Sequence, residues 1–320
     1  MIRISPRFFL LALALGLLAI GPVSAQYFRQ SNYWKTHRQE VEFGLGISNF
    51  LGELGGRNQI GSPFVWDLEL SQTRPAASLA YRYYLARQQS LRLRLTYGVL
   101  AGNDNLTTEP FRHNRNLNFK SDVVELSLVY ELHLYREELG HIYDLRGVKG
   151  TKSGRVGLYF FGGVGAFYFD PRAQFNNAWV RLKPLHTEGQ GLPGGAEDYN
   201  NIQVCIPMGV GIRRALTKQW SAGLELQYTK TFTDYIDDVS TKYYDNAAIL
   251  AANGDIAAFL ADPSLNELPW DATGTNAQRG DETDLDAYLF LKFTADWKMY
   301  KYKSGSKKYR ARIRRQKIVF

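Results

Sequence analysis

Five histidines are the side chains of this sequence best suited to acid–base catalysis, because an imidazole titrates near neutral pH. They are His37, His113, His133, His141 and His186. His133 follows Glu131 in a segment that alternates like a strand, whereas His113 and His186 have no Ser or Asp partner at an informative spacing. A lipid-modifying enzyme is one alternative, but we predict no catalytic residues and place His133 in an internal ion network.

Three aspartates in the run 231–241 (TFTDYIDDVST) carry the oxygen ligands that calcium prefers. They are Asp234, Asp237 and Asp238. The run lacks the glycine and the distal glutamate of a calcium-binding loop, so we predict no metal site and favour a solvated or hydrogen-bonded loop corner. The single cysteine, Cys205, excludes a disulfide scaffold and a cysteine-based zinc module.

The segment Gly209-Val210-Gly211 has the first two glycines of a dinucleotide-binding fingerprint. Arg214 occupies the position of the third glycine, and no helical pattern follows. We therefore predict no bound cofactor. The glycines are better explained as small residues on the inward face of a strand.

From residue 40 onward, apolar and polar residues alternate with a period of two, which indicates β-strands. In Leu91–Val99 five apolar side chains share one face, and Arg92 and Arg94 lie on the other. Val156–Phe169 carries glycine and aromatic residues on both faces, so its orientation stays open. The eight predicted strands are 41–47, 79–83, 91–99, 124–134, 156–169, 202–212, 220–228 and 287–297.

The connections between these strands alternate between long and short. Residues 86–89 and 215–219 are short connections, whereas 50–77 and 233–284 are long. Outer-membrane barrels have short periplasmic turns and long outer loops, and aromatic residues gather near their strand ends. The pattern favours an all-β fold, an eight-stranded antiparallel transmembrane β-barrel with long extracellular loops, over a secreted sandwich.

The polar face of each strand must then point into a narrow interior that side chains fill. It carries five cations and four carboxylates that can form pairs, which makes burial of the charges tolerable. They are Arg82, Arg92, Arg94, Arg213 and Lys292, with Glu42, Glu125, Glu131 and Glu225. Such a filling argues against a diffusion channel.

The chain begins with the pattern of a secretory signal peptide, residues 1–25, in which basic residues precede an apolar stretch and a small-residue cleavage site. An N-terminal periplasmic segment, 26–39, then leads into the barrel, 40–297. Residues 298–320 hold ten Lys or Arg and no acidic residue, although the net charge of the whole chain is only +8. An exported protein rarely meets nucleic acid, so we predict none as a partner.

The basic tail is expected to enter the periplasm, where it would attract an acidic partner or anionic lipid headgroups. A solvated extension and a fold-back of the terminal Ile318-Val319-Phe320 as strand material stay open as alternatives. The residues that we predict to bind a partner are Arg310, Arg312, Arg314 and Arg315 in the tail, and Asp234, Asp237 and Asp238 on the outer side.

Four segments together resemble one protein family. They are Thr231–Asp245 (TFTDYIDDVSTKYYD), Trp179–Gly191 (WVRLKPLHTEGQG), Arg74-Pro75 with the following Tyr81-Arg82-Tyr83, and Arg115–Phe119 (RNLNF). The family is the outer-membrane barrel family of Bacteroidetes that includes PorG, a component of the type IX protein secretion system. The similarity spans roughly residues 38–297, and the aspartate-rich run is its most specific part.

The resemblance implies an outer-membrane protein that ties the periplasmic ring of PorK lipoprotein and PorN subunits to the membrane. It brings no catalytic residues and no cofactor. We therefore expect a non-enzymatic component of the secretion machine, a barrel that is monomeric within a larger complex and surrounded by outer-membrane lipid. The alternative is a small surface barrel, of the kind represented by OmpA and OmpX, whose loops bind an external ligand or partner.

Overall fold

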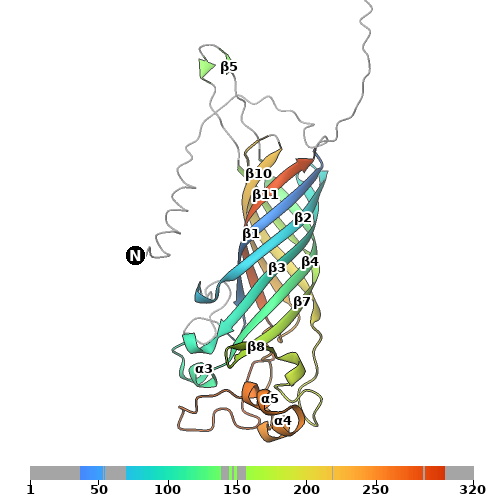
Figure 1. Cartoon of the computed structure of the whole chain (residues 1–320). Helices are drawn as coiled ribbons and strands as arrows, with labels where there is room; N and C mark the ends of the chain where they lie inside the picture. Colours follow the sequence, from blue (N-terminus) through green and yellow to red (C-terminus); the bar gives the residue numbers. More distant parts are fainter. Residues whose placement is uncertain are drawn as a thin grey trace, which may run out of the picture.

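The computed structural model describes residues 37–52, 54, 70–137, 144–145, 148–149, 156–217, 219–283 and 285–299. Eight long strands form a closed antiparallel barrel (Figure 1). They are β1 (Gln39–Leu51), β2 (Arg74–Ala86), β3 (Gln89–Asn103), β4 (Asn118–Tyr135), β7 (Val156–Phe175), β9 (Ile202–Ala215), β10 (Trp220–Thr231) and β11 (Ala287–Met299). In the described ranges, no helix has the length and apolarity needed to span a membrane.

Each strand pairs with the next one along the chain, and β1 pairs with β11 to close the ring. The register places Gln39 opposite Met299, so both ends of the barrel sequence lie at the same edge of the wall. The predicted eight-stranded barrel is confirmed. Most strands extend beyond their predicted ends, mainly toward the long loops, where the alternation in the sequence becomes irregular.

The two ends of the barrel differ in the length of their connections. At one end, which we call the turn end, residues 87–88 join β2 to β3, residues 216–219 join β9 to β10, and a longer connection, 136–155, joins β4 to β7. At the other, the loop end, residues 52–73, 104–117, 176–201 and 232–286 connect the strands. This asymmetry is typical of outer-membrane barrels, whose longer loops lie outside the cell.

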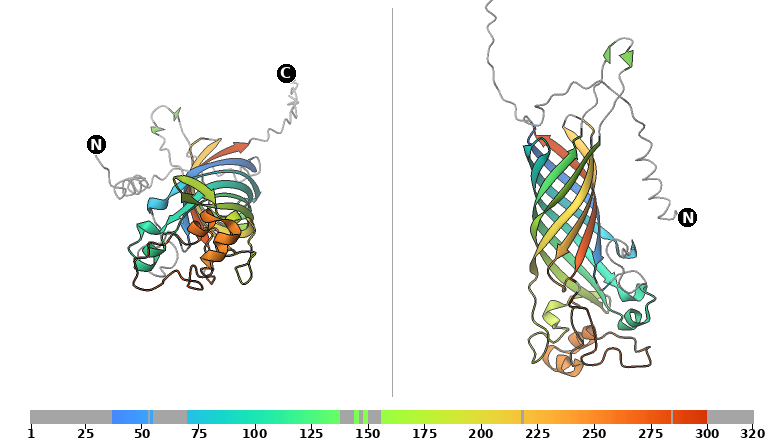
Figure 2. Two further views of the ribbon diagram at one scale, coloured as in Figure 1. Left: turned by 60° about the horizontal axis from the view of Figure 1, so that its bottom comes forward. Right: turned by 180° about the vertical axis from the view of Figure 1, so that it is seen from behind.

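Short elements give the long loops a defined structure at the loop end (Figure 2). They are η2 (Leu70–Gln72), η3 (Asp104–Leu106), α3 (Pro110–Arg115), β8 (Ala178–Arg181), η4 (Lys183–Leu185), α4 (Asn246–Asn253) and α5 (Asp255–Ala261). Two further strands, β5 (Asp144–Leu145) and β6 (Val148–Lys149), pair with each other in the β4–β7 connection.

Helices α3 and α4 begin where the sequence supplies a side-chain cap for their unpaired N–H groups. The Glu109 side chain accepts hydrogen bonds from the N–H groups of Phe111 and Arg112, and Pro110, which lacks an N–H, occupies the first turn of α3. The Asp245 side chain accepts from the N–H of Ala247 at the start of α4. These caps explain why short helices form in a chain that otherwise consists of strands.

The outer face of the barrel is apolar. Along β4, the outward side chains are Val124, Leu126, Leu128, Tyr130, Leu132 and Leu134, each exposed by 39–53%. Ten residues at about 3.3 Å each, tilted by about 40°, give this row a height of about 25 Å, the height of the apolar band of an outer-membrane barrel. Water would not stabilise such a surface, whereas lipid does.

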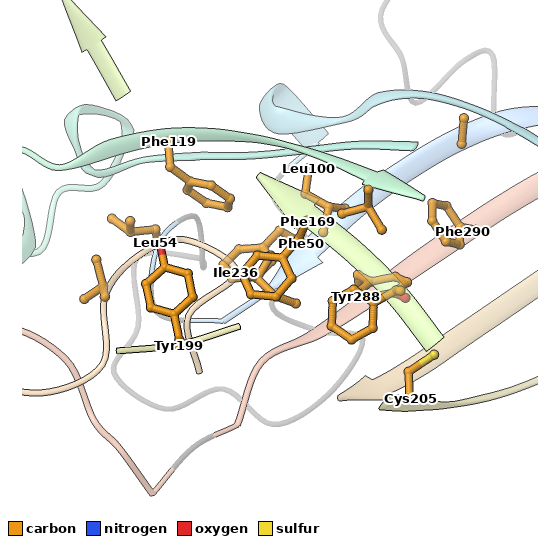
Figure 3. Packing of buried hydrophobic residues seen from close by; sticks show 14 of the residues in the cluster. Phe50, Leu54, Leu100, Phe119, Phe169, Tyr199, Cys205, Ile236, Tyr288 and Phe290 are labelled. Atoms are coloured by element: carbon orange, nitrogen blue, oxygen red, sulfur yellow. The ribbon is translucent and has the colours of Figure 1, made fainter. Parts of the chain in front are cut away.

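The inner face has two layers. The turn-end half contains buried charges, and the loop-end half contains a cluster of aromatic and aliphatic side chains (Figure 3). Phe50 and Phe119 meet edge to face at 4.8 Å between ring centres, and Phe167 and Phe169 stack at 5.5 Å. The orientation of β7, which the sequence left open, is therefore settled: Phe167 and Phe169 point inward.

Glycine makes room where the wall is tightest. A Cβ atom at Gly46 would collide with the backbone of Leu291 and Lys292 on the neighbouring strand. At Gly162 the same atom would meet nothing within 4 Å. Gly46 is therefore required by close approach of the backbone, whereas Gly162 is not.

Candidate functional site: the filled barrel and its outer cap

The centre of the ionic layer is Arg82, whose side chain has no exposed area. Its guanidinium donates to Glu131 at 2.6 Å and to Glu40 at 3.1 Å. It also donates to Glu42 and Asp296. Arg82 lies on β2, and these carboxylates come from β1, β4 and β11. One side chain therefore links β2 to three other strands across the interior.

A second group of charges lies nearer the middle of the barrel. Arg92 donates to Glu225 at 2.6 Å and to Glu42 at 2.8 Å. Arg94 donates to the other oxygen of Glu225 at 2.8 Å, and Lys292 lies 3.3 Å from the same oxygen. Among the described residues, the predicted cations and carboxylates all join this network, because the strand period places them on one face.

A third group of charges lies at the turn end, and most of its members fall outside the predicted set of interior charges. Arg213 donates to Glu40 at 2.7 Å and lies 2.9 Å from Glu137. Lys298 donates to Glu137 at 2.9 Å and is 3% exposed. β11 runs two residues past the end predicted for the last strand, so Lys298 belongs to β11 and to the interior. Asp296, which the sequence analysis did not single out, is also buried here.

His133 occupies the position that the sequence predicted. Its Nε2 is 2.8 Å from the Ser90 hydroxyl and 3.4 Å from Glu131. Ser90 also donates to Glu131 at 2.5 Å, and all three side chains are at most 1% exposed. A serine, a histidine and a carboxylate are together, but the serine is bonded to the carboxylate itself and is sealed from substrate. The arrangement stabilises the interior.

The long loops fold into a cap at the loop end, and a buried polar network joins them. The Arg279 Nη1 donates to the carbonyl of Asp238 at 2.6 Å and to Glu188 at 2.9 Å. Glu188 in turn accepts from the N–H of Ser240 at 2.9 Å and from the hydroxyl of Thr241 at 2.8 Å. The connection 176–201 and the connection 232–286 are thus bonded into one unit.

Asp234, Asp237 and Asp238 lie within this cap and not on its surface: they are 5%, 1% and 1% exposed. Neighbouring loops cover their side chains, so a partner at the loop end would meet the surrounding loops first, and a contact with these aspartates stays a prediction. Asp238 accepts from Thr187 and Tyr199, both at 2.6 Å. The hydrogen-bonded corner, which the sequence analysis also considered, is the arrangement that forms.

Burial raises the pKa of Asp238 to about 6, although the Arg279 guanidinium and the hydrogen bonds from Thr187 and Tyr199 oppose the rise. Burial also raises the pKa of the Tyr199 phenol. Within the described ranges, no group of three or more His, Cys, Asp and Glu side chains is arranged to hold a metal ion.

Several predicted segments lie outside the described residues. They are the signal peptide 1–25, most of the segment 26–39, and the tail from residue 300, including Arg310, Arg312, Arg314 and Arg315. The structure does show where the barrel ends before the tail: Met299 is the last residue of β11, at the turn end.

The closed wall, its apolar exterior and its charged interior define the class of this protein. A ring of strands is the form in which β-structure satisfies every backbone N–H and C=O group in lipid. The chain is a transmembrane β-barrel of the outer membrane, with an interior that side chains fill and a folded cap over the loop end.

Residues 27–178 match a protein family described as a domain of unknown function (DUF6089), a range that includes β1 to β4 and β7. No curated protein matches the sequence. Solved structures that match include Ail, the attachment invasion locus protein of Yersinia pestis, at 9% identity, with 82% of this chain and 99% of that chain covered and a TM-score of 0.35.

The outer membrane protein OprG from Pseudomonas aeruginosa matches at 8% identity, covering 83% of this chain and 98% of its own, with a TM-score of 0.34. Neisserial surface protein A matches at 9% identity, with 82% of this chain and 97% of that chain covered and a TM-score of 0.33. Similarity at this level does not assign a function.

Proposed function

We propose that this barrel is a non-enzymatic component of a type IX protein secretion system, which anchors or orients a periplasmic ring of PorK- and PorN-type subunits. The sequence resemblance to the PorG family supports the proposal. So does the filled interior, because a barrel without an open lumen acts through its surfaces.

The observation that carries the proposal is the place where the chain leaves the barrel. β11 ends at Met299 at the turn end, the periplasmic end of an outer-membrane barrel. The residues that follow are strongly basic and include Arg310, Arg312, Arg314 and Arg315. A concentration of positive charge there is suited to an acidic surface on a periplasmic partner.

Affinity purification of the full-length barrel from detergent-solubilised outer membrane tests the proposal. The expected result is co-purification of the ring subunits. Replacement of the four arginines by glutamine should weaken the affinity for the ring by up to about a thousandfold and remove most of the recovered ring, since each Lys or Arg facing an anionic surface contributes about 1 kcal/mol.

The matched control replaces the same four arginines by lysine, which keeps the charge, and should recover the ring as the wild type does. Absence of ring subunits from the wild-type preparation would reject the proposed function. If the glutamine and lysine variants recover equal amounts of the ring, the tail is not the contact. Another periplasmic surface of the barrel would then bind the ring.

A second candidate function, binding of an external ligand by the cap, has one observation in its favour. A pocket of about 490 Å³ opens between α3 and the segment around Glu267. Its polar lining includes Asn105, Thr107, Thr108 and His113, the last 3.5 Å from Glu267. Binding of intact cells to an immobilised ligand, lost in Glu267→Gln, would favour this function over the first.

A further inference from the structure

The outer face of β4, β7 and β8 carries a cluster of charged side chains directly beyond the apolar band at the loop end. We call it the outer-rim cluster; it consists of Lys120, Asp122, Asp170, Arg172 and Arg181. The register pairs Lys120 with Arg172, Asp122 with Asp170, and Arg172 with Arg181, so all five side chains share the lipid-facing side of the wall.

The depth of the cluster follows from the same register. Val124 is the last apolar residue of the outward row on β4, and Asp122 and Lys120 are the next two outward positions. Each step of two residues rises by about 5 Å in a strand tilted by about 40°. The cluster therefore lies about 5–10 Å beyond the hydrocarbon, which is the depth of the lipid headgroups.

The two carboxylates hold the arginines in place. Arg172 donates to Asp170 at 2.7 and 3.0 Å, and Arg181 donates to the other oxygen of Asp170 at 2.8 Å. Asp170 is 4% exposed, whereas the arginine side chains are 38% and 58% exposed. The guanidinium groups are thus fixed from the protein side and open toward the membrane.

Asp122 is held in a similar way, by the Tyr97 hydroxyl at 2.9 Å and by Arg172 at 3.4 Å. Three cations face two carboxylates, so the cluster keeps a positive charge. Within the described part of the chain, the hydrogen bonds of both arginines use Nε and Nη2, so the Nη1 of each can donate to a ligand outside the wall.

Lys120 borders a groove of about 350 Å³ that continues from the cluster. Its Nζ lies 5.8 Å from the Trp179 ring, and the groove is also lined by Gln72, Asn103 and Gln174. An indole at headgroup depth is typical of a membrane interface, and the amides offer hydrogen bonds to hydroxyl or ester oxygens. The groove has room for the polar part of a lipid beside the cations.

We propose that the outer-rim cluster is a binding site for a phosphorylated lipid headgroup in the leaflet at the loop end. Arg172 and Arg181 bind the phosphate oxygens through charge-assisted hydrogen bonds, and Lys120 adds a third positive charge at the mouth of the groove. This site is independent of the ring contact at the opposite end of the barrel.

The test uses the full-length protein in nanodiscs of phosphatidylcholine, titrated with phosphatidic acid and followed by native mass spectrometry. We expect phosphatidic acid to be retained in preference to phosphatidylcholine. Lys120→Gln/Arg181→Gln leaves Arg172 on Asp170 and should weaken the apparent affinity by about tenfold or more. Lys120→Gln alone, which disturbs neither arginine pair, should weaken the apparent affinity by about fivefold.

The matched control is Arg214→Gln/Lys230→Gln, which removes two outward-facing cations from β9 and β10. It should bind phosphatidic acid as the wild type does. Equal losses in the two double variants, or equal retention of the two lipids by the wild type, would overturn the proposal. Displacement of the lipid by inorganic phosphate at equal concentration would show that the site takes the free ion, and would overturn the assignment to a lipid.

Discussion

Replacement of Arg82 by methionine tests the ionic layer most severely, because one guanidinium bonds four carboxylates. Methionine has a similar reach and adds no charge, so the change removes the ion pairs without leaving a large cavity. In the wild type, the interior network has six cations and seven carboxylates among the described residues. The variant has five cations for the same seven carboxylates.

The expected cost is about 3–5 kcal/mol in the free energy of unfolding, the usual penalty for removing one partner of a buried ion pair. It is measured by urea titration of the barrel folded into lipid vesicles, with tryptophan fluorescence as the signal. Lys230→Met on the outer face is the control, and it should cost less than about 1 kcal/mol.

A double-mutant cycle separates the charge effect from a packing effect. Asp296 depends on Arg82 and on a longer 3.4 Å contact with Arg213. When Asp296→Asn is combined with Arg82→Met, it should therefore restore at least about 1 kcal/mol of the free energy of unfolding that Arg82→Met loses. A loss below about 1 kcal/mol for the single variant, or strict additivity in the double variant, would refute the reasoning.

Three further predictions follow from the wall, the lipid face and the cap. Gly46→Ala should destabilise the barrel by about 1–3 kcal/mol in the same urea titration, because its Cβ meets the backbone of β11, whereas Gly162→Ala should be neutral; equal effects would contradict this. Leu128→Arg, at the middle of the lipid-facing row, should cost about 2–4 kcal/mol in vesicles, and a neutral result would mean that this face does not meet lipid. Folding raises the pKa of Asp238 from 3.8 to about 6, so its contribution to cap stability is complete below pH 4 and is lost as the pH rises through 6. The protection of the cap amides, which is their exchange rate relative to the intrinsic rate at each pH, should fall between pH 4 and 7 in the wild type but not in Asp238→Asn, and equal pH profiles of protection would refute the assignment.

The sequence predicts the wall of this barrel well because one physical rule determines it. In lipid, an outward side chain must be apolar and an inward one has no such requirement, so strands with polar inward residues alternate clearly, whereas β7, whose inward residues are largely aromatic, does not. Leu91–Val99 shows this most clearly, and its inward arginines lie where the alternation places them. Most charges of the inner face could therefore be identified before their contacts were known, and those missed lie at or beyond the predicted strand ends or, like Asp296, in a strand whose inward positions were not all assigned.

Other parts depend on contacts between distant segments. Asp238 resembles an exposed loop residue in sequence, but Thr187 and Tyr199, some 51 and 39 positions away, cover it. Lys298 resembles the first residue of a basic tail, but Glu137 pairs with it across the turn end. Nothing local in the chain distinguishes these residues from solvated ones, so local patterns cannot place them.

Spin-label accessibility along β4 tests the central claim most directly. Single cysteines are introduced at Leu126, Ser127, Leu128 and Val129 in a Cys205→Ala background, and the barrel is reconstituted in lipid. A lipid-facing wall around a filled interior predicts high oxygen accessibility at Leu126 and Leu128, and low accessibility to both oxygen and a water-soluble nickel complex at Ser127 and Val129. Strong accessibility of Ser127 and Val129 to the nickel complex would mean a water-filled lumen and would contradict the account.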